Sequence, residues 1–332
     1  MSFRELPEKE MVRRIIIGLN DQLSLEQRKA YVKTLVPVQW LLSNVKNFRN
    51  YGREAYATLR WLRAGENRTL LEYGEKYFPS FEGLTSRLPY LLFIEGVVPE
   101  HQPKLAIVGT RRPNYQALQE AFKLGFEASL NGLSCVSGMA EGVDQAGMRG
   151  CLSASEVTRL PSASSSNTRS SSASPCLGVL ACGHNLEYPA FTSRLRQEII
   201  EQGGAIISRF APDTPSYKSN FVSRNMIIAA YSSAVVAVQA PRHSGTLITS
   251  DYAISMNKDV YVGSAGLGEE PCSEGTKALA YEGAPVVRGL EDFDELATFR
   301  AKATPATGYD AENSKDKVRF GDKWYIVERI LR

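Results

Sequence analysis

The sequence predicts an α/β protein, in which a smaller helical domain precedes a doubly wound, mostly parallel β-sheet. Two observations support this fold class. Seven short, nearly continuous apolar runs lie between residues 104 and 289, with segments between them that suit helices, whereas residues 1–95 carry apolar residues at helical spacing. Parallel strands buried on both faces have such continuous runs, and right-handed helical crossovers between them produce a Rossmann-like sheet.

The expected sheet defines a domain from residue 96 to residue 300. Several runs end in glycine or serine, as strands often do where a loop begins. Ligands of such sheets bind beyond the carboxyl ends of the strands, so the residues that follow each run are candidates for function. The seven expected strands are LAIVG (105–109), SCVSG (134–138), LGVLACG (177–183), AIISR (205–209), AVVAVQA (234–240), DVYVG (259–263) and PVVRG (285–289).

Residues 1–95 are predicted to form a helical N-terminal domain. Apolar residues from Arg53 to Phe78 follow a helical period. Basic and aromatic side chains alternate just before and at its start, which suits a minor nucleic-acid contact, although the solvated face of an amphipathic domain is the more common explanation. The interleaved residues are Lys46, Phe48, Arg49 and Tyr51.

Two segments lie outside the expected core. Residues 153–175, SASEVTRLPSASSSNTRSSSASP, are rich in serine and poor in apolar residues, which predicts a flexible surface insertion. Residues 301–332 are predicted to be a linker and a short tail that ends in KWYIVERILR.

Composition excludes several classes of protein. No run approaches the roughly 20 apolar residues of a membrane span, and the polar N-terminus does not resemble a signal peptide, so we expect a cytoplasmic protein without membrane contact. The five cysteines form no CxxC pair, which favours reduced core thiols over a metal site or a disulfide framework. A net charge of +3 is too small to indicate a polyanion partner by itself.

The loop after the first strand carries Gly109, Thr110 and Arg111. A dinucleotide fingerprint would need Gly-x-Gly-x-x-Gly here, so no nicotinamide cofactor, and no other cofactor, is expected. Glycine allows close backbone approach, and the threonine and arginine donors suit a phosphate.

After the second strand, Ser137 and Gly138 precede a helix whose free N–H groups favour an anion. Asp144 in the first turn of this helix is expected to brace the loop rather than to catalyse.

The fourth and fifth strands lead to two further sets of donors. Lys218, Phe221, Arg224 and Asn225 stand at a helix start, where two cations and an aromatic ring can hold a phosphate and stack a base. Core packing remains an equal alternative for Phe221, and an internal ion pair is the alternative for Arg224. Hydroxyl and N–H donors at the next helix start form another anion site, made of Ser244, Gly245 and Thr246.

The motifs together resemble the DprA/Smf family (DNA processing protein A). The match covers about residues 90 to 290 in the family's order, and the combination is specific. The motifs are Gly109-Thr110-Arg111, SGMAEGVD (137–144), GHNLEYP (183–189), FVSRNMIIA (221–229), SGTLITS (244–250) and EGTKALAYEGA (274–284).

The resemblance implies a protein that binds single-stranded DNA without sequence preference and without catalysis. It also implies a homodimer formed through the Rossmann-like domain, and delivery of the DNA to RecA in transformation and recombination. The implied DNA pocket comprises the glycine, threonine and arginine after the first strand, the four residues from Lys218 to Asn225 named above, and Ser244 to Thr246. Glu141, Gly147, Arg209 and Met226 depart from the family pattern.

A nucleotide-processing enzyme related to the phosphoribohydrolases is the alternative function. Those enzymes have a Pro-Gly-Gly-x-Gly-Thr motif followed by a catalytic glutamate, whereas this chain has Arg242-His243-Ser244-Gly245-Thr246. Hydrolysis needs a positioned carboxylate, and Asp251 is the only nearby candidate in the sequence.

Overall fold

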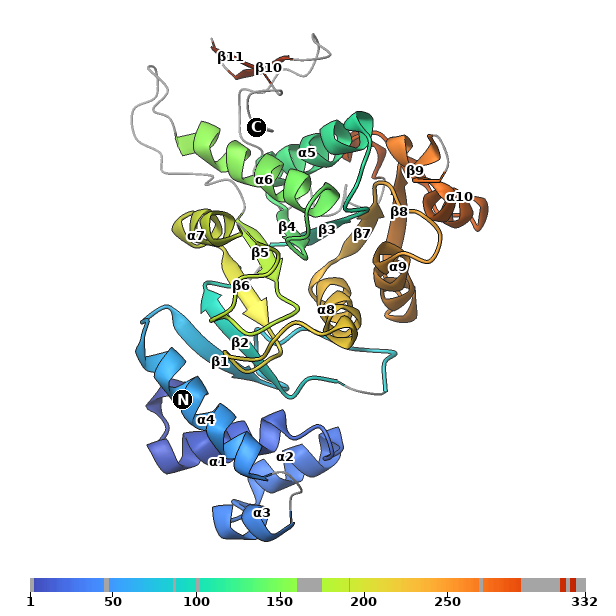
Figure 1. Cartoon of the computed structure of the whole chain (residues 1–332). Coiled ribbons are helices and arrows are strands. Elements are labelled where there is room, and N and C mark those ends of the chain that lie inside the picture. Colours follow the sequence, from blue (N-terminus) through green and yellow to red (C-terminus); the bar gives the residue numbers. More distant parts are fainter. Residues whose placement is uncertain are drawn as a thin grey trace.

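The computed structural model describes residues 3–44, 48–85, 88–99, 102–159, 175–190, 192–268, 271–293, 317–320 and 323–326. It confirms the predicted fold class, because a nine-stranded sheet carries helices on both faces and a helical bundle lies at one end of it (Figure 1). None of the described helices is long and apolar enough to cross a membrane.

The sheet runs in the order β1-β2-β6-β5-β4-β3-β7-β8-β9. All seven predicted strands are present as β3 to β9, and they pair in parallel. Two further strands extend the sheet, with β1 antiparallel to β2 and β2 antiparallel to β6. The bounds are β1 Arg68–Glu72, β2 Leu91–Gly96, β3 Lys104–Val108, β4 Ser134–Ser137, β5 Cys176–Val179, β6 Ala205–Ser208, β7 Ala234–Ala237, β8 Asp259–Gly263 and β9 Val286–Val287.

Successive side chains of each strand enter different layers of the core, as a period of two requires. On β3, Leu105 and Ile107 belong to the core layer that includes residues of α5, α6 and α7, whereas Ala106 and Val108 belong to the layer that includes residues of α8 and α9. The bounds are α5 Tyr115–Leu130, α6 Val143–Arg159, α7 Ser193–Glu201, α8 Lys218–Tyr231, α9 Gly245–Ser255 and α10 Glu274–Tyr281, with short 3-10 helices at Phe3–Glu5, Ser264–Leu267 and Leu290–Asp292.

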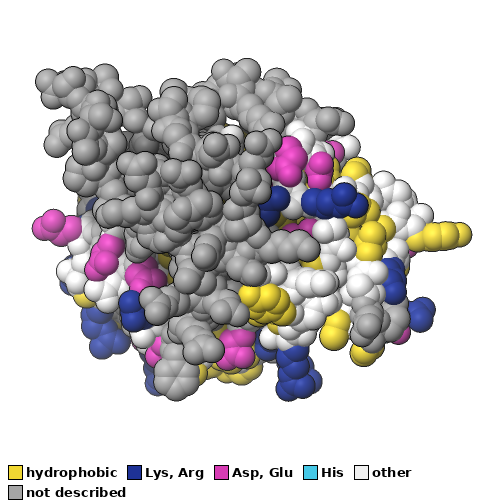
Figure 2. Space-filling view, turned by 90° about the horizontal axis from the view of Figure 1, so that it is seen from above, with side chains coloured by type: hydrophobic (Ala, Val, Ile, Leu, Met, Phe, Trp, Pro, Cys, Tyr) yellow, Lys and Arg dark blue, Asp and Glu magenta, His cyan; other side chains and the backbone are white. Residues whose placement is uncertain are grey.

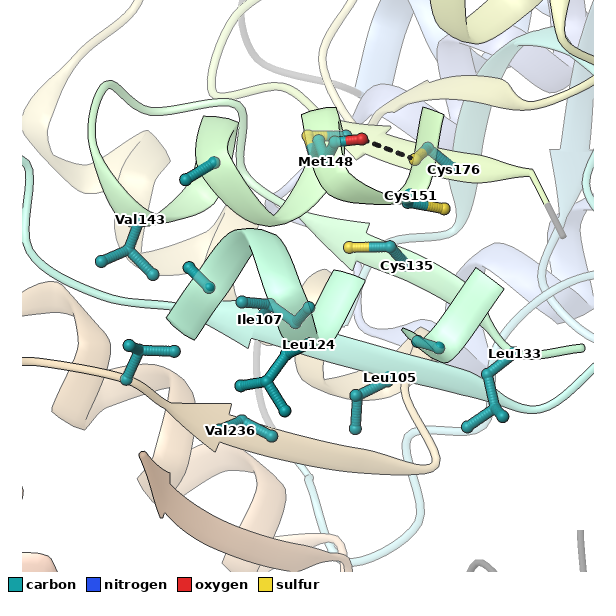
Figure 3. Packing of buried hydrophobic residues seen from close by; sticks show 14 of the residues in the cluster. Leu105, Ile107, Leu124, Leu133, Cys135, Val143, Met148, Cys151, Cys176 and Val236 are labelled. Carbon is teal, nitrogen blue, oxygen red and sulfur yellow. Dashed lines mark hydrogen bonds between the residues drawn. The ribbon is translucent and has the colours of Figure 1, made fainter. Parts of the chain in front are cut away.

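Three cysteines pack among these aliphatic side chains. Cys135 of β4, Cys151 of α6 and Cys176 of β5 are fully buried free thiols (Figure 3). The Cys176 thiol donates to the Met148 carbonyl over 3.6 Å. Together with the buried Cys182, they are the core thiols that the sequence predicts.

The sheet has a switch point between β3 and β7. These strands are neighbours, yet α5 leaves β3 toward one face while α9 leaves β7 toward the other. The loops after the two strands therefore part, and a crevice opens at their carboxyl ends. The residues that follow β3 and β7 are Gly109 to Arg111 and Ser244 to Thr246.

The helical bundle before the sheet differs from the prediction for residues 1–95. Its helices are α1 Glu8–Leu19, α2 Leu25–Lys33, α3 Val38–Asn44 and α4 Phe48–Arg63. The predicted helical stretch ends at Arg63, and Leu70 and Leu71 lie in β1 instead. Leu70 packs on the bundle core and Leu71 on the sheet core, so the two neighbours point to opposite faces as strand residues do.

Two other predicted boundaries are affected. Helix α6 continues to Arg159, so the predicted start of the flexible insertion at Ser153 is wrong. Residues 160–174 lie outside the described residues, as do 301–316 of the predicted linker and the interleaved residue Lys46. In the predicted tail, β10 (Lys317–Phe320) and β11 (Lys323–Ile326) form an antiparallel hairpin.

A buried polar contact joins the bundle side of the sheet to the loop after β5. The His184 Nδ1 atom lies 3.6 Å from Glu95 Oε2, and the Arg68 guanidinium bonds Glu95 Oε1 over 2.9 Å. His184 Nε2 also bonds the Phe93 carbonyl, which gives this histidine a structural role. His184 and Arg68 together lower the pKa of Glu95 to about 2.

We predict that Glu95→Gln lowers stability more at neutral pH than in acid. Because the folded-state pKa of Glu95 is below its ordinary 4.5, its contribution is complete above that value and is lost as pH falls toward about 2. Urea unfolding at neutral pH and at about pH 3 measures the difference between wild type and variant. Glu82→Gln, at an exposed position, is the control. A difference that stays constant over this range would contradict the interpretation.

Candidate nucleic-acid interface

Two adjoining cavities lie at the carboxyl ends of the strands. The switch-point cavity, between the loops after β3 and β7, has a volume of about 470 Å³. The side cavity, beside the loops after β4 and β5, has a volume of about 130 Å³. The lining of both includes Arg111, Ala140, Phe221 and Arg224.

The loop after β3 is fixed by its backbone. The Thr110 N–H donates to the Gln239 carbonyl over 2.7 Å, and the Thr110 carbonyl accepts from the Val143 N–H over 3.3 Å. Gly109 is required here, because a Cβ atom would lie 2.6 Å from the Val143 side chain. These bonds hold the Arg111 backbone at the cavity rim while its side chain remains exposed.

Arg224 is the buried charge of the site. Its guanidinium lies 3.6 Å from the Asp144 carboxylate, an ion pair too long for a hydrogen bond. Gly138 makes room for it, since a Cβ atom on Gly138 would lie 0.9 Å from an Arg224 nitrogen. Among the described residues, Arg224 Nε has no hydrogen-bond partner. Burial lowers the pKa of Arg224 and raises the pKa of Asp144, and the ion pair opposes both shifts.

Two cations lie close to the Phe221 ring. The guanidinium carbons of Arg111 and Arg224 lie 5.3 Å and 5.8 Å from its ring centroid. The Tyr188 ring meets it edge-on at 5.3 Å. Because Phe221 lines both cavities and is only partly buried, its ring is accessible for stacking, and packing in the core does not account for its position.

The start of α9 supplies donors to the switch-point cavity. Ser244 is the N-cap residue, and its hydroxyl is buried without a hydrogen-bond partner among the described residues. The Asn225 amide donates to the Gly245 carbonyl over 2.9 Å, which ties α8 to α9. Ser244, Gly245, Thr246 and Asn225 all line this cavity, so the first N–H groups of α9 are near it.

Two predicted residues are not brought to the cavities. The Ser137 hydroxyl is fully buried and donates to the Ile107 carbonyl over 2.7 Å, so its predicted contact with a ligand is wrong. Lys218 is exposed at the first position of α8 and lines neither cavity. Six residues are about 1.7 helical turns, which rotates Lys218 about 120° away from Arg224.

Tyr188 and Arg112 are candidate ligand contacts that were not among the predicted site residues. Tyr188 lines the side cavity, and Arg112 lines the switch-point cavity next to Arg111. The GHNLEYP motif contains Tyr188, but nothing in the spacing shows that its ring reaches α8. Glu141, which departs from the family pattern, also lines the side cavity and brings a negative charge to its rim.

Basic and acidic side chains are mixed on one face of the protein. On the visible part of the face shown in Figure 2, Lys and Arg side chains are interspersed with Asp and Glu. Within the described ranges, no cluster of three or more His, Cys, Asp or Glu side chains could hold a metal ion.

Comparisons with known proteins agree on one family. The family model described as DNA recombination-mediator protein A matches residues 69–298. The Escherichia coli (strain K12) protein Smf is 28% identical over 78% of this chain, and the match spans 64% of the relative, less than two thirds of its length.

Two solved structures are similar in fold. The structure of DNA processing protein A from Streptococcus pneumoniae has a TM-score of 0.64 and 22% identity, and the match covers 86% of this chain and 96% of that one. A structure of DNA processing protein A from Helicobacter pylori, described for its single-stranded DNA binding mode, has a TM-score of 0.55 and 25% identity, with coverage of 71% and 97%.

We predict that Asp144→Asn destabilises the protein by about 3 kcal/mol, because it leaves the buried Arg224 charge without its counter-charge. The double variant Asp144→Asn, Arg224→Met removes the unpaired charge and should recover part of this loss. Urea unfolding of the wild type and the two variants measures both effects. Equal stability of Asp144→Asn and wild type would show that the ion pair does not hold the site.

Proposed function

We propose, from the premise that this chain belongs to the DNA recombination-mediator protein A (DprA/Smf) family, that it binds single-stranded DNA at the two joined cavities. The observation that carries the proposal is the accessible Phe221 ring with the Arg111 and Arg224 guanidiniums close to it. An aromatic face stacks on any base and the guanidiniums attract the backbone, so binding needs no base-specific hydrogen bonds.

Unpartnered donors support an anionic ligand. In the described structure, Arg224 Nε and the Ser244 hydroxyl are buried at the switch-point cavity without hydrogen-bond partners. Buried donors normally have a hydrogen-bond acceptor, and a phosphate oxygen could accept from both the guanidinium N–H and the hydroxyl. The N-terminus of α9 adds free N–H groups and the positive end of a helix dipole.

We assign the phosphate contacts to Thr110, Arg111 and Arg224, and to the Ser244–Thr246 segment. Gly109 and Gly138 provide room for the backbone and for Arg224, and Asn225 positions the start of α9. Lys218 remains a predicted phosphate contact outside the cavities. The relative from Helicobacter pylori, which is described as binding single-stranded DNA, supports the assignment of the ligand class.

The location, the oligomeric state and the role in recombination are also proposals. We propose that the protein is cytoplasmic, forms a homodimer through its Rossmann-like domain, and loads RecA onto single-stranded DNA during transformation or recombination. Membership of a recombination-mediator family supports these roles.

The nucleotide-processing alternative has less support from the site. Asp251, its candidate carboxylate, is exposed and lines neither cavity. Asp144 does line the switch-point cavity, but it accepts the Ala140 N–H and pairs with Arg224. A general base must reach the proton that it removes, and neither carboxylate is placed for that role.

We predict that Arg111→Ala weakens oligo-dT binding by about 1–3 kcal/mol, as expected for a charge-assisted contact. The slope of log affinity against log salt should fall by about 0.7, because one fewer phosphate is neutralised. Fluorescence anisotropy over a salt series measures both quantities. Arg194→Ala removes an equal charge from a largely exposed position on α7 and is the matched control. Equal affinities of Arg111→Ala and Arg194→Ala would refute the assignment.

We predict that Gly138→Ala weakens oligo-dT binding and also lowers the melting temperature, because moving the Arg224 guanidinium disturbs its buried ion pair with Asp144. The added methyl group occupies the position of the Arg224 guanidinium, which must move along a flexible side chain. Anisotropy and thermal unfolding of the same preparation separate the two effects. Unchanged DNA affinity would mean that the position of Arg224 does not matter for binding.

A further inference from the structure

A third hollow, the α4 groove, lies between the helical bundle and the loop that leads to α8. Its volume is about 710 Å³, and it is lined by α4 on one side and by residues 211–217 on the other. The lining contains two acidic residues, Glu54 and Asp213, and five basic or aromatic ones: Arg53, Tyr56, Arg60, Arg63 and Tyr217.

The basic and aromatic residues of α4 form a separate face of that helix. Arg53, Tyr56 and Arg60 are exposed at spacings of three and four residues. The bundle core takes the other face, which contains Ala55, Leu59, Trp61 and Leu62. Tyr56 is 61% exposed and Tyr217 is 59% exposed, so neither ring is needed to fill the core.

The charges of the groove are only partly balanced. Arg63 pairs with Glu8, and the Asp213 carboxylate accepts from the Asn185 amide over 2.7 Å. In the described part of the chain, Arg53 and Arg60 form no ion pair. Glu54 also lines the groove and brings a second carboxyl to it; burial raises the pKa of this carboxyl.

The α4 groove continues the line of the two cavities. Along the sheet, the switch-point cavity lies at β3 and β7, the side cavity at β4 and β5, and the groove next to the loop after β6. Tyr217 of the groove is one helical turn before Phe221 of the cavities, and Lys218 is exposed between them. The Gly183 N–H donates to the Thr214 carbonyl over 2.8 Å, which joins the loops of the side cavity and the groove.

We propose that the α4 groove binds the nucleotides that flank the segment held in the cavities, so that one DNA strand runs from the switch point to the helical bundle. This inference rests on the proposed function, because the groove acts as an extension of the same site. Guanidiniums along a groove with exposed tyrosine rings suit a backbone whose bases stack on the rings. From β7 to β6, four strand spacings of about 4.8 Å make roughly 19 Å, so a DNA strand that occupies both the switch-point cavity and the groove must span more than this distance.

The test compares short and long oligo-dT. An oligonucleotide of about 4 residues can fill the cavities but does not span the distance to the groove, whereas one of about 16 residues spans both. The variant Arg53→Ala, Arg60→Ala removes two groove charges. The control variant, Lys9→Ala, Lys33→Ala, removes two exposed charges of the same bundle that do not line the groove.

The groove variant should bind the long oligonucleotide about ten-fold more weakly than wild type, with a salt slope smaller by about 1.4. Its affinity for the short oligonucleotide should change less than two-fold, and the control variant should match wild type at both lengths. Tyr56→Ala should reproduce the length-dependent loss with an unchanged salt slope, because a stacking ring carries no charge. Thermal unfolding checks that each variant is folded.

Two results would overturn the inference and leave the proposed function intact: wild-type affinity of the groove variant at both lengths, or an equal loss at both lengths. A wild-type protein that binds neither oligonucleotide would instead refute the proposed function, and the inference with it.

Discussion

The buried ion pair between Arg224 and Asp144 is the interaction on which the site depends. A guanidinium in a protein interior needs a counter-charge, and Asp144 in the first turn of α6 supplies it from the neighbouring strand end. The pair holds Arg224 beneath the Phe221 ring, and Gly138 leaves room for it. Among the described residues, the Arg224 Nε atom has no hydrogen-bond partner, so the guanidinium retains an unused donor.

The location of the site follows from the sheet. Parallel strands place their carboxyl ends at one edge of the sheet. The helices that follow β3 and β7 cross to opposite faces, and this opens a crevice at that edge. With a net charge of only +3, the DNA affinity that we propose must come from a local concentration of arginines. Arg111, Arg112 and Arg224 provide it at the switch point, and we propose that Arg53 and Arg60 extend it toward the bundle.

The sequence predicted the central strands well, because strands buried on both faces leave continuous apolar runs. It did not predict β1, since Leu70 and Leu71 also fit a helical period and only tertiary packing assigns them to opposite faces.

In the site, the positions of loop residues were easier to predict from the sequence than the positions of residues next to a strand or helix end. Ser137 is the last residue of β4, and its side chain still follows the strand's inward direction. Lys218 was misplaced because spacings of three drift around a helix. Tyr188 reaches Phe221 only through the fold, which spacing cannot reveal.

The central claim is that the joined cavities hold the backbone of an unpaired strand while Phe221 stacks on a base. A titration of the wild-type protein with oligo-dT and with duplex DNA of equal length, over a series of salt concentrations, tests it most directly. The account predicts tighter binding of the single strand, with an affinity that falls steeply as salt rises. A preference for the duplex, or an affinity for oligo-dT that does not change with salt, would contradict it.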